Sequence, residues 1–333
     1  MKKTLTKRKS LSLFILGASL AVMLLLPMSS LFAAADDYPN KPVRFVIPFA
    51  PGGSTDVVGR LIATKLYQRL GHQFIVENRA GAGSAIGSEM VAKAKPDGYT
   101  LLFNTSAYAT NPLISEVPYD PAKAFVPIAK VGGAAAVLSV HPSVPANSVQ
   151  ELLALAKKQP GQLISSGAGI GSFGHLASEL FRSMAGIDYK IVQFKGGGPA
   201  MIDTVGGHSQ INMGSLALTL PQIRARGLKA LGYGALVRSR LVPDMPTISE
   251  SGVPGYEAII WWALAAPAGT PKAIVDRLYK ELNVILQAED MKKAFDIQGA
   301  DIALIGPDAT DKFIEAERVK WGKIIKEANI KGK

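Results

Sequence analysis

Residues 43–62 read VRFVIPFAPGGSTDVVGRLI and hold an apolar run, a turn and a helical repeat in succession. It opens with an apolar, β-branched run at 43–49, which is followed by the breakers Pro51, Gly52 and Gly53. Apolar residues then recur at helical spacing until Gly71. A strand, a glycine-rich turn and a helix in this order predict the start of a βαβ unit.

The same alternation continues along the chain. Further strands are predicted at 73–77 and 100–104, with a small-residue helix at about 84–94 between them. In the middle of the chain the predicted strands are 136–140, 163–166, 189–194, 211–215 and 228–233, and the predicted helices are 149–157, 176–184, 200–205 and 220–226. Apolar strands that alternate with helices indicate an α/β protein of two lobes, each a mostly parallel sheet flanked by helices.

The last part of the chain predicts how the lobes are connected. One more apolar strand at 258–266 and two amphipathic helices around 274–285 and 313–325 are too few elements for a third lobe. We therefore expect this tail to return to the first lobe, so that the chain crosses between lobes near 132–135 and near 235–240. The predicted first lobe is 36–134 plus 241–333, and the predicted second lobe is 135–240. Two crossings form a hinge, and a cleft between lobes is a usual ligand site.

The N-terminus has the layout of a secretory signal peptide. Five basic residues precede an apolar run at 11–26, and the small residues 33–35 supply an A-x-A cleavage site before Asp36. The run is shorter than the roughly 20 residues that span a bilayer, which favours cleavage over an uncleaved anchor. We expect residues 1–35 to be removed, which leaves 298 of the 333 residues in a periplasmic protein.

Composition excludes several classes of function. The chain has no cysteine, so disulfides, thiolate metal sites, a cysteine nucleophile and a lipidated N-terminal cysteine are excluded. The formal net charge of +11 falls to +6 without the five basic residues of the signal, and no run of lysine and arginine occurs elsewhere. The mature protein therefore lacks the basic footprint of a nucleic-acid binder.

The turn PGGSTD at 51–56 is the first candidate binding element. It joins a strand end to a helix start, where glycines let a ligand approach the backbone and the free amides and helix dipole favour an anion. A carboxylate is the ligand that this chemistry indicates. Asp56 is interpreted first as a cap or brace of the turn and second as a ligand contact.

A matching turn in the second lobe reads SSGAGIGSFGH at 165–175 and again lies between a strand and a helix. Two such turns are expected to face each other across the cleft. The stretch also contains the G-x-G-x-x-G pattern of dinucleotide sites. However, the next strand runs into Lys195 and not into the acidic residue that would bind a ribose, which disfavours a nucleotide.

Metal binding and hydrolysis receive little support from the sequence. His175 and Glu179 have the i, i+4 spacing of a metal pair, but no third ligand has a recognisable spacing, so a local hydrogen bond of His175 is preferred. Neither Ser172 nor Ser54 fits the nucleophile elbow G-x-S-x-G. We expect no catalytic group, no metal and no cofactor.

Two further elements complete the candidate site. A third turn, KGGGPA at 195–200, opens a predicted helix with Asp203 in its first turn, and Lys195 is a candidate cation. Thr105 and Ser106 follow the predicted strand 100–104 and are candidate hydroxyl donors, because open α/β sheets bind ligands at the carboxyl ends of strands.

Seven motifs occur in order along the chain: YPxKPVR at 38–44, PGGxxD at 51–56, ENRxGAG at 77–83, PDGYTL at 96–101, GSxxHLA at 171–177, KGxxPA at 195–200 and AAPAGTP at 265–271. With these motifs the chain closely resembles the substrate-binding receptors of the tripartite tricarboxylate transporters, the Bug family. The resemblance implies a type II periplasmic-binding-protein fold whose two lobes close on a carboxylate-bearing ligand. It also implies delivery of that ligand to a membrane permease of one large and one small subunit.

The resemblance implies site residues as well, because such receptors hold the ligand with the strand-to-helix turns of both lobes, largely through main-chain amides and ordered water. With the hydroxyl candidates added, the predicted ligand-binding residues are Pro48, Gly52, Gly53, Ser54, Asp56, Thr105, Ser106, Ser166, Gly169, Ser172, His175, Lys195, Gly196 and Asp203. Two alternatives stay open: an exported hydrolase on the same scaffold, and a ligand sensor that presents its closed form to a signalling partner.

Overall fold

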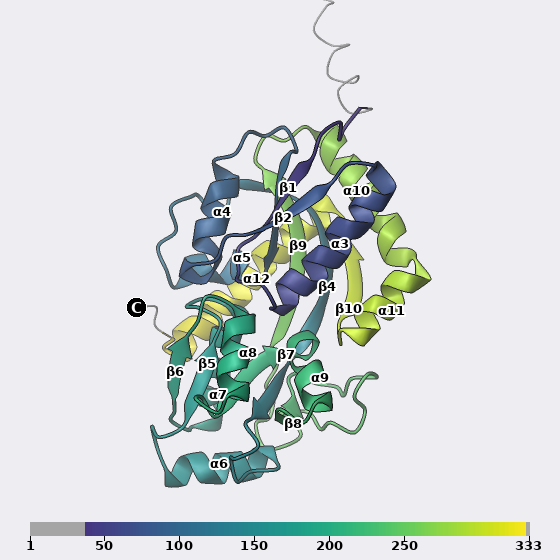
Figure 1. Ribbon diagram of the computed structural model, residues 1–333. Helices are drawn as coiled ribbons and strands as arrows, with labels where there is room; N and C mark the ends of the chain where they lie inside the picture. The colour runs from purple at the N-terminus through teal and green to yellow at the C-terminus, as the bar shows by residue number, and fades with distance from the viewer. Residues whose placement is uncertain (1–36, 331–333) are drawn as a thin grey trace, which may run out of the picture. The chain divides into compact units, whose positions relative to one another are not determined.

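The computed structural model of the protein describes residues 37–330 (Figure 1). Residues 37–40 belong to one unit, and the chain from Lys41 onward forms a second unit that holds the strands and helices below. The predicted signal peptide at 1–35 and the predicted mature N-terminus at Asp36 lie outside the described residues. Within 37–330, no helix has the length and apolar character that crossing a membrane requires.

The strands and helices alternate through most of the chain. The strands are β1 (Val43–Ile47), β2 (Phe74–Asn78), β3 (Thr100–Thr105), β4 (Phe125–Val140), β5 (Ile164–Gly167), β6 (Lys190–Gln193), β7 (Ile211–Ser215), β8 (Lys229–Tyr233), β9 (Ile259–Pro267) and β10 (Asp301–Ile305). The helices are α3 (Ser54–Leu70), α4 (Ala85–Ala92), α5 (Ala107–Thr110), α6 (Val149–Lys158), α7 (Phe173–Ala185), α8 (Gly197–Val205), α9 (Leu216–Arg224), α10 (Lys272–Gln287), α11 (Glu289–Ile297) and α12 (Pro307–Glu327). Short 3-10 helices lie at Ala82–Ser84 and Asn111–Leu113.

One long strand, β4, runs through both halves of the sheet, whose order is β2-β1-β3-β9-β4-β7-β5-β6 (Figure 1). Its first part pairs with β9, up to the pair Ala135 and Ile259. Its second part, from Ala136 onward, pairs with β7 and β8. The strand therefore changes partners beside the predicted first crossing at 132–135.

The chain returns from the second half of the sheet near Ala258. The backbone amide of Ala136 donates to Ala258 O, and the amide of Ala258 donates to Gly234 O. Before this point Tyr256 is still held by α7, because its hydroxyl donates to Ala177 O at 2.9 Å. These contacts favour a return near Ala258 over the predicted crossing at 235–240, and the lobe boundaries themselves stay a prediction.

The sheets are mixed and not mostly parallel as predicted. β1 pairs in parallel with β2 and β3, and β5 pairs in parallel with β6 and β7. In contrast β9 runs antiparallel to β3 and β4, and β4 runs antiparallel to β7, β8 and β10. The antiparallel pairs all involve the two strands that connect the halves. The sequence had predicted only 136–140 of β4, and it had missed β10 and α11.

The C-terminal tail lies against the elements of the first half. β10 pairs with β4, and Lys65 on α3 forms an ion pair with Asp290 on α11 at 2.6 Å. Arg69 of α3 likewise pairs with Glu281 of α10. The tail thus covers α3, the helix whose N-terminus reaches the candidate site.

Helix α3 approaches the sheet closely at Gly59. A Cβ atom at this position would lie 2.7 Å from Ile47 Cδ1 and 3.0 Å from Phe103 Cδ1. Phe103 stacks on Phe45 with ring centroids 5.4 Å apart, and both rings are fully buried. Burial of such a side chain stabilises the fold by about 1.5–3 kcal/mol. The first turns of α3 are therefore held against the sheet by the packing of Gly59 on Ile47 and Phe103.

Candidate functional site

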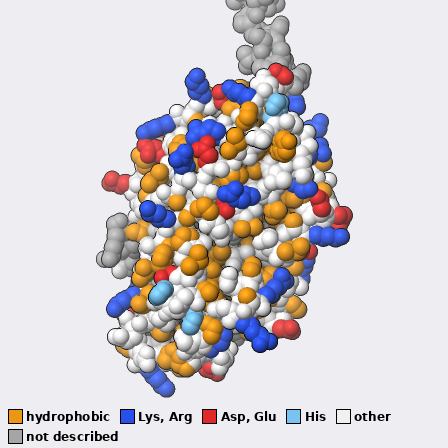
Figure 2. Space-filling model, in the orientation of Figure 1, with side chains coloured by type: hydrophobic (Ala, Val, Ile, Leu, Met, Phe, Trp, Pro, Cys, Tyr) orange, Lys and Arg blue, Asp and Glu red, His pale blue; other side chains and the backbone are white. Residues whose placement is uncertain are grey.

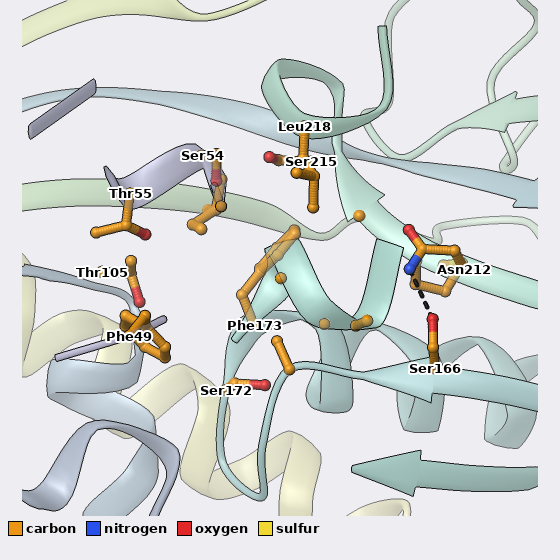
Figure 3. A pocket seen from close by; sticks show the side chains of 18 residues that line it. Phe49, Ser54, Thr55, Thr105, Ser166, Ser172, Phe173, Asn212, Ser215 and Leu218 are labelled. Atoms are coloured by element: carbon orange, nitrogen blue, oxygen red, sulfur yellow. Dashed lines mark hydrogen bonds between the residues drawn. The ribbon is translucent and has the colours of Figure 1, made fainter. Parts of the chain in front are cut away.

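A small cavity lies where β1, β3, β5 and β7 end and four helices begin (Figure 3). Its volume is about 50 Å³, room for a few water molecules at about 10–15 Å³ each. Figure 3 shows Ser54, Thr55 and Thr105 on one side, Ser166 and Asn212 on the other, and Phe173 between them. The lining residues are Phe49, Gly53, Ser54, Thr55, Thr105, Ser166, Ala168, Ser172, Phe173, Gly174, Gly197, Ala200, Asn212, Met213, Gly214, Ser215, Leu218 and Ile260.

Helix N-termini dominate the polar character of this cavity. α3, α7, α8 and α9 each place a residue of their first turn or their N-cap in its lining. The first amides of a helix have no partner within the helix, and they carry the positive end of its dipole. None of the lining residues is charged. An anion here would therefore be held by amides, hydroxyls and dipoles, without a cationic side chain.

The turn before α3 is braced by Asp56, as its preferred interpretation predicted. Asp56 Oδ2 accepts from Gly52 N at 3.1 Å, and Oδ1 accepts from Arg60 Nε at 3.0 Å and from Asn78 Nδ2 at 2.9 Å. Burial alone would raise the pKa of Asp56, but these hydrogen bonds outweigh it and lower the pKa below its usual value. Asp56 does not line the cavity, whereas Gly53 and Ser54 do, so its part in the site is to position the turn.

Asp56→Ala should lower the free energy of unfolding by about 1–2 kcal/mol at neutral pH, because it removes a brace and takes away the carboxylate that accepts three part-buried hydrogen bonds. Since the folded-state pKa is lowered, the stabilisation is present above the unfolded pKa and is lost as pH falls through the folded pKa. Urea unfolding of parent and variant should therefore give curves that converge in acid.

Asp276→Ala is the matched control, since Asp276 forms only an exposed i, i+4 pair with Lys272. Such a pair contributes at most about 0.5 kcal/mol. A stability loss for Asp56→Ala that equals the loss for Asp276→Ala would refute the bracing role.

The turn before α7 is held in the same manner. Ser172 is the N-cap of α7, and its hydroxyl accepts from His175 N. The buried ring of His175 accepts from Gly171 N through Nδ1 at 3.2 Å. Burial lowers the pKa of His175, while the neighbouring Glu179 opposes the shift. The local hydrogen bond preferred for His175 is confirmed. Within residues 37–330, no group of three or more His, Cys, Asp or Glu residues could hold a metal ion.

The two halves touch around the cavity, so the structure is closed. Ala50 N donates to Lys195 O at 3.0 Å. The Thr110 hydroxyl donates to Gly171 O at 2.9 Å. A Cβ atom on Gly53 would lie 3.4 Å from Gly198 N, at the N-terminus of α8. Backbone groups make most of these contacts, which leaves little trace in the side-chain pattern of the sequence.

The structure brings part of the predicted site together. Five predicted residues line the cavity: Gly53, Ser54, Thr105, Ser166 and Ser172. The other nine do not: Pro48, Gly52, Asp56, Ser106, Gly169, His175, Lys195, Gly196 and Asp203. Most of the nine lie in the same turns, where they shape the backbone; Gly169 and Gly196, for example, have positive φ.

Two of the predicted residues lie elsewhere than expected. α8 begins at Gly197, so Asp203 lies near the end of its second turn and not in the first turn. The Lys195 side chain is exposed and lines a neighbouring cavity of about 220 Å³, while its carbonyl group makes the contact with Ala50. Lys195 is therefore no cation of the main cavity.

Asn212 and Ser215 are the polar lining residues of β7 that sequence reasoning missed. Both are 2 % exposed. Ser215 ends a strand whose range was predicted correctly, and ligands bind at the carboxyl ends of strands in open α/β sheets. The same rule that selected Thr105 at the end of β3 would have selected Ser215 at the end of β7.

Comparison with known proteins identifies the family of the chain. Residues 58–330 match the model of the tripartite tricarboxylate transporter family receptors. The chain belongs to this family. BugT of Bordetella pertussis is 36% identical over 90% of this chain and 92% of BugT, which confirms the resemblance to the Bug proteins.

Two similar solved structures carry organic acids. R. palustris Rpa4515 with adipate is 34% identical, with a TM-score of 0.86 over 88% of this chain and 99% of that one. MatC from Rhodopseudomonas palustris with bound malate is 30% identical, with a TM-score of 0.81 over 86% of this chain and 100% of that one. The predicted two-lobed periplasmic-binding-protein fold is thereby confirmed. The chain is a solute-binding receptor and not an enzyme, so the exported hydrolase is discarded.

Proposed function

We propose that this receptor captures a small carboxylate-bearing organic anion in the closed cavity and delivers it to the membrane permease of a tripartite tricarboxylate transporter. The observation that carries the proposal is the convergence of four helix N-termini on a cavity with no charged side chain in its lining. Backbone amides at helix starts bind anions, and hydroxyls supply further donors. The acids bound by Rpa4515 and MatC, adipate and malate, support the same ligand class.

The proposal includes export to the periplasm through cleavage of residues 1–35. Support comes from the basic and apolar N-terminal segment and from the family of periplasmic receptors. The surface also fits a freely diffusing carrier: on the face in Figure 2, lysines and arginines are scattered among acidic and uncharged side chains and do not gather in one patch. Mass spectrometry of the exported protein should find Asp36, or a residue within two positions of it, at the N-terminus. Recovery of the full-length chain from the membrane fraction would contradict export by cleavage.

A carboxylate ligand should raise the melting temperature, because a ligand that binds only the folded state stabilises it by RT ln(1 + [L]/Kd). This is about 2.7 kcal/mol at one hundred times Kd. Thermal unfolding in a panel of mono-, di- and tricarboxylates, with neutral sugars as the control, tests this expectation. If sugars shift the melt and no acid does, the ligand class is wrong.

Delivery to the permease has its own test. Uptake of the identified acid into vesicles that contain the two permease subunits should require the receptor on the outside. Uptake that proceeds equally well without the receptor would separate this protein from the transporter and leave a sensor role.

A further inference from the structure

Two buried polar atoms in the cavity wall have no hydrogen-bond partner. They are Asn212 Oδ1 and Ser215 Oγ, both on β7, and both side chains are 2 % exposed. Leaving a buried polar atom without a partner costs about 1–3 kcal/mol, so native proteins satisfy such atoms with water or ligand. In Figure 3 the amide of Asn212 points toward the side chains that line the cavity. The two atoms therefore mark positions in the cavity wall that water or a ligand has to satisfy.

The hydrogen-bond network assigns the amide of Asn212. Ser166 Oγ accepts from Asn212 Nδ2 at 2.8 Å and lies 2.7 Å from Thr204 Oγ1. Thr204 Oγ1 in turn lies 2.7 Å from Ser209 Oγ and 3.2 Å from Ala200 O, so Thr204 can accept the Ser166 proton while it donates its own to one of these two oxygens. The amide nitrogen faces Ser166, and Oδ1 is left as an acceptor.

Glycine at 214 keeps this acceptor open. A Cβ atom there would lie 2.7 Å from Asn212 Oδ1 and 2.8 Å from Thr219 Oγ1. An ionised carboxylate has only acceptors, so it cannot satisfy Oδ1 itself. Either an ordered water or a donor on the ligand has to fill this role, and a donor on the ligand would make Asn212 a residue that recognises the ligand.

A hydroxyl fits this donor better than an ammonium group. None of the lining residues is acidic, and both carboxylate oxygens of Asp56 are already bonded within the turn. An ammonium group would be buried with no acidic side chain to pair with and only the carboxylate of the ligand as its counter-charge, which is more costly than burying a hydroxyl with an acceptor. The hydroxyl and a carboxylate can lie several bonds apart on the ligand, because Asn212 and Ser215, the N-cap of α9, are three residues apart on an extended strand, about 10 Å between Cα atoms.

We propose that the ligand is a small hydroxycarboxylate whose hydroxyl donates to Asn212 Oδ1, while a carboxylate accepts from Ser215 Oγ and the helix-start amides. This inference rests on the proposed function, because it assumes that the cavity binds a carboxylate. Asn212 is then the residue that selects hydroxy acids against their unsubstituted analogues. The loss of one hydrogen bond at a buried acceptor corresponds to about a ten- to hundredfold weaker affinity.

Calorimetric titration with matched acids tests the proposal. The pairs are lactate and propionate, malate and succinate, and 2-hydroxyglutarate and glutarate, with aspartate as the ammonium analogue of malate. The best-bound hydroxy acid should bind about ten- to hundredfold more tightly than its unsubstituted partner, and malate should bind more tightly than aspartate. Asn212→Leu, which keeps the size of the side chain and removes the acceptor, should abolish the preference within the pair.

Asn283→Leu on α10 is the control and should leave the preference unchanged, since Asn283 does not line the cavity and its amide oxygen accepts from Gln287 within the same helix. If Asn212→Leu does not fold, the comparison of acids on the parent protein still tests whether the site prefers a hydroxyl group. Equal or tighter binding of the unsubstituted acids or of aspartate would overturn the hydroxyl assignment and leave carboxylate binding intact. Failure of every acid to bind would reject the proposed function and this inference together.

Discussion

Gly53→Val should weaken ligand binding at least about a hundredfold while the protein stays folded. Gly53 has φ −82° and ψ 166°, an extended conformation that valine adopts without strain. Its missing side chain faces the N-terminus of α8, where a Cβ atom would lie 3.4 Å from Gly198 N and 3.6 Å from Gly197 N. The valine methyl groups extend about 1.5 Å further and would occupy the space between the two helix starts. A hundredfold loss corresponds to about 2.8 kcal/mol.

Gly53→Ala is the matched variant, since its Cβ makes only ordinary van der Waals contact with α8. Its affinity should fall between those of the parent and of Gly53→Val. Calorimetry measures the affinities, and thermal unfolding of the free proteins shows whether both variants fold. Parent-like binding by Gly53→Val would mean that the turn before α3 serves only the fold and that the ligand is held elsewhere.

The turns of the site could be predicted because their local chemistry is visible in the sequence. Gly53, Ser54 and Ser172 lie between an apolar strand and a helical repeat, where breakers and capping residues mark the boundary. A strand-to-helix turn in an α/β protein points to the carboxyl edge of the sheet, and the structure places these three residues in the cavity there.

Asn212 and Ser215 were missed because β7 reads as a buried strand, INMGS, and all five residues are buried. Burial alone accounts for the apolar residues of such a strand, so its polar residues were also taken to be structural and no ligand contact was considered for them. What distinguishes Asn212 is its unpaired Oδ1, and this depends on the directions of hydrogen bonds from Ser166 and Thr204. No sequence spacing encodes those directions.

The first half of β4 was missed for a different reason. It contains Pro127, Gly132 and Gly133, which are typical strand breakers. The glycines are explained by neighbours distant in sequence: a Cβ on Gly132 would lie 2.4 Å from Asp301 O, and one on Gly133 would lie 2.6 Å from Ile260 O. They allow β10 and β9 to approach the strand that connects the lobes. The first half of β4 could therefore be predicted only once the positions of its partner strands were known.

Gly83→Ala should weaken binding by about 5- to 140-fold although Gly83 does not line the cavity. Gly83 lies in the 3-10 helix Ala82–Ser84, and in the closed structure its Cβ would be 1.9 Å from Ile170 O and 2.6 Å from Asn111 Nδ2. Ile170 belongs to the turn before α7, so the added methyl group obstructs the contact between the lobes. Overpacking of this kind costs about 1–3 kcal/mol. Because it destabilises the closed conformation, a smaller fraction of the protein is competent to hold ligand.

Gly71→Ala separates this obstruction from backbone strain. Gly83 and Gly71 both have positive φ, +61° and +75°, so alanine is strained at either position by about 1–2 kcal/mol. No atom lies within 4 Å of a Cβ on Gly71, at the C-terminal end of α3, so this variant should lose stability and keep its affinity. Small-angle scattering should show that ligand compacts the parent and Gly71→Ala, while Gly83→Ala stays expanded at the same ligand concentration. If Gly83→Ala binds and compacts as Gly71→Ala does, the contact between Gly83 and Ile170 does not control closure, and the lobes close on the ligand by the contacts of Ala50 and Thr110 alone.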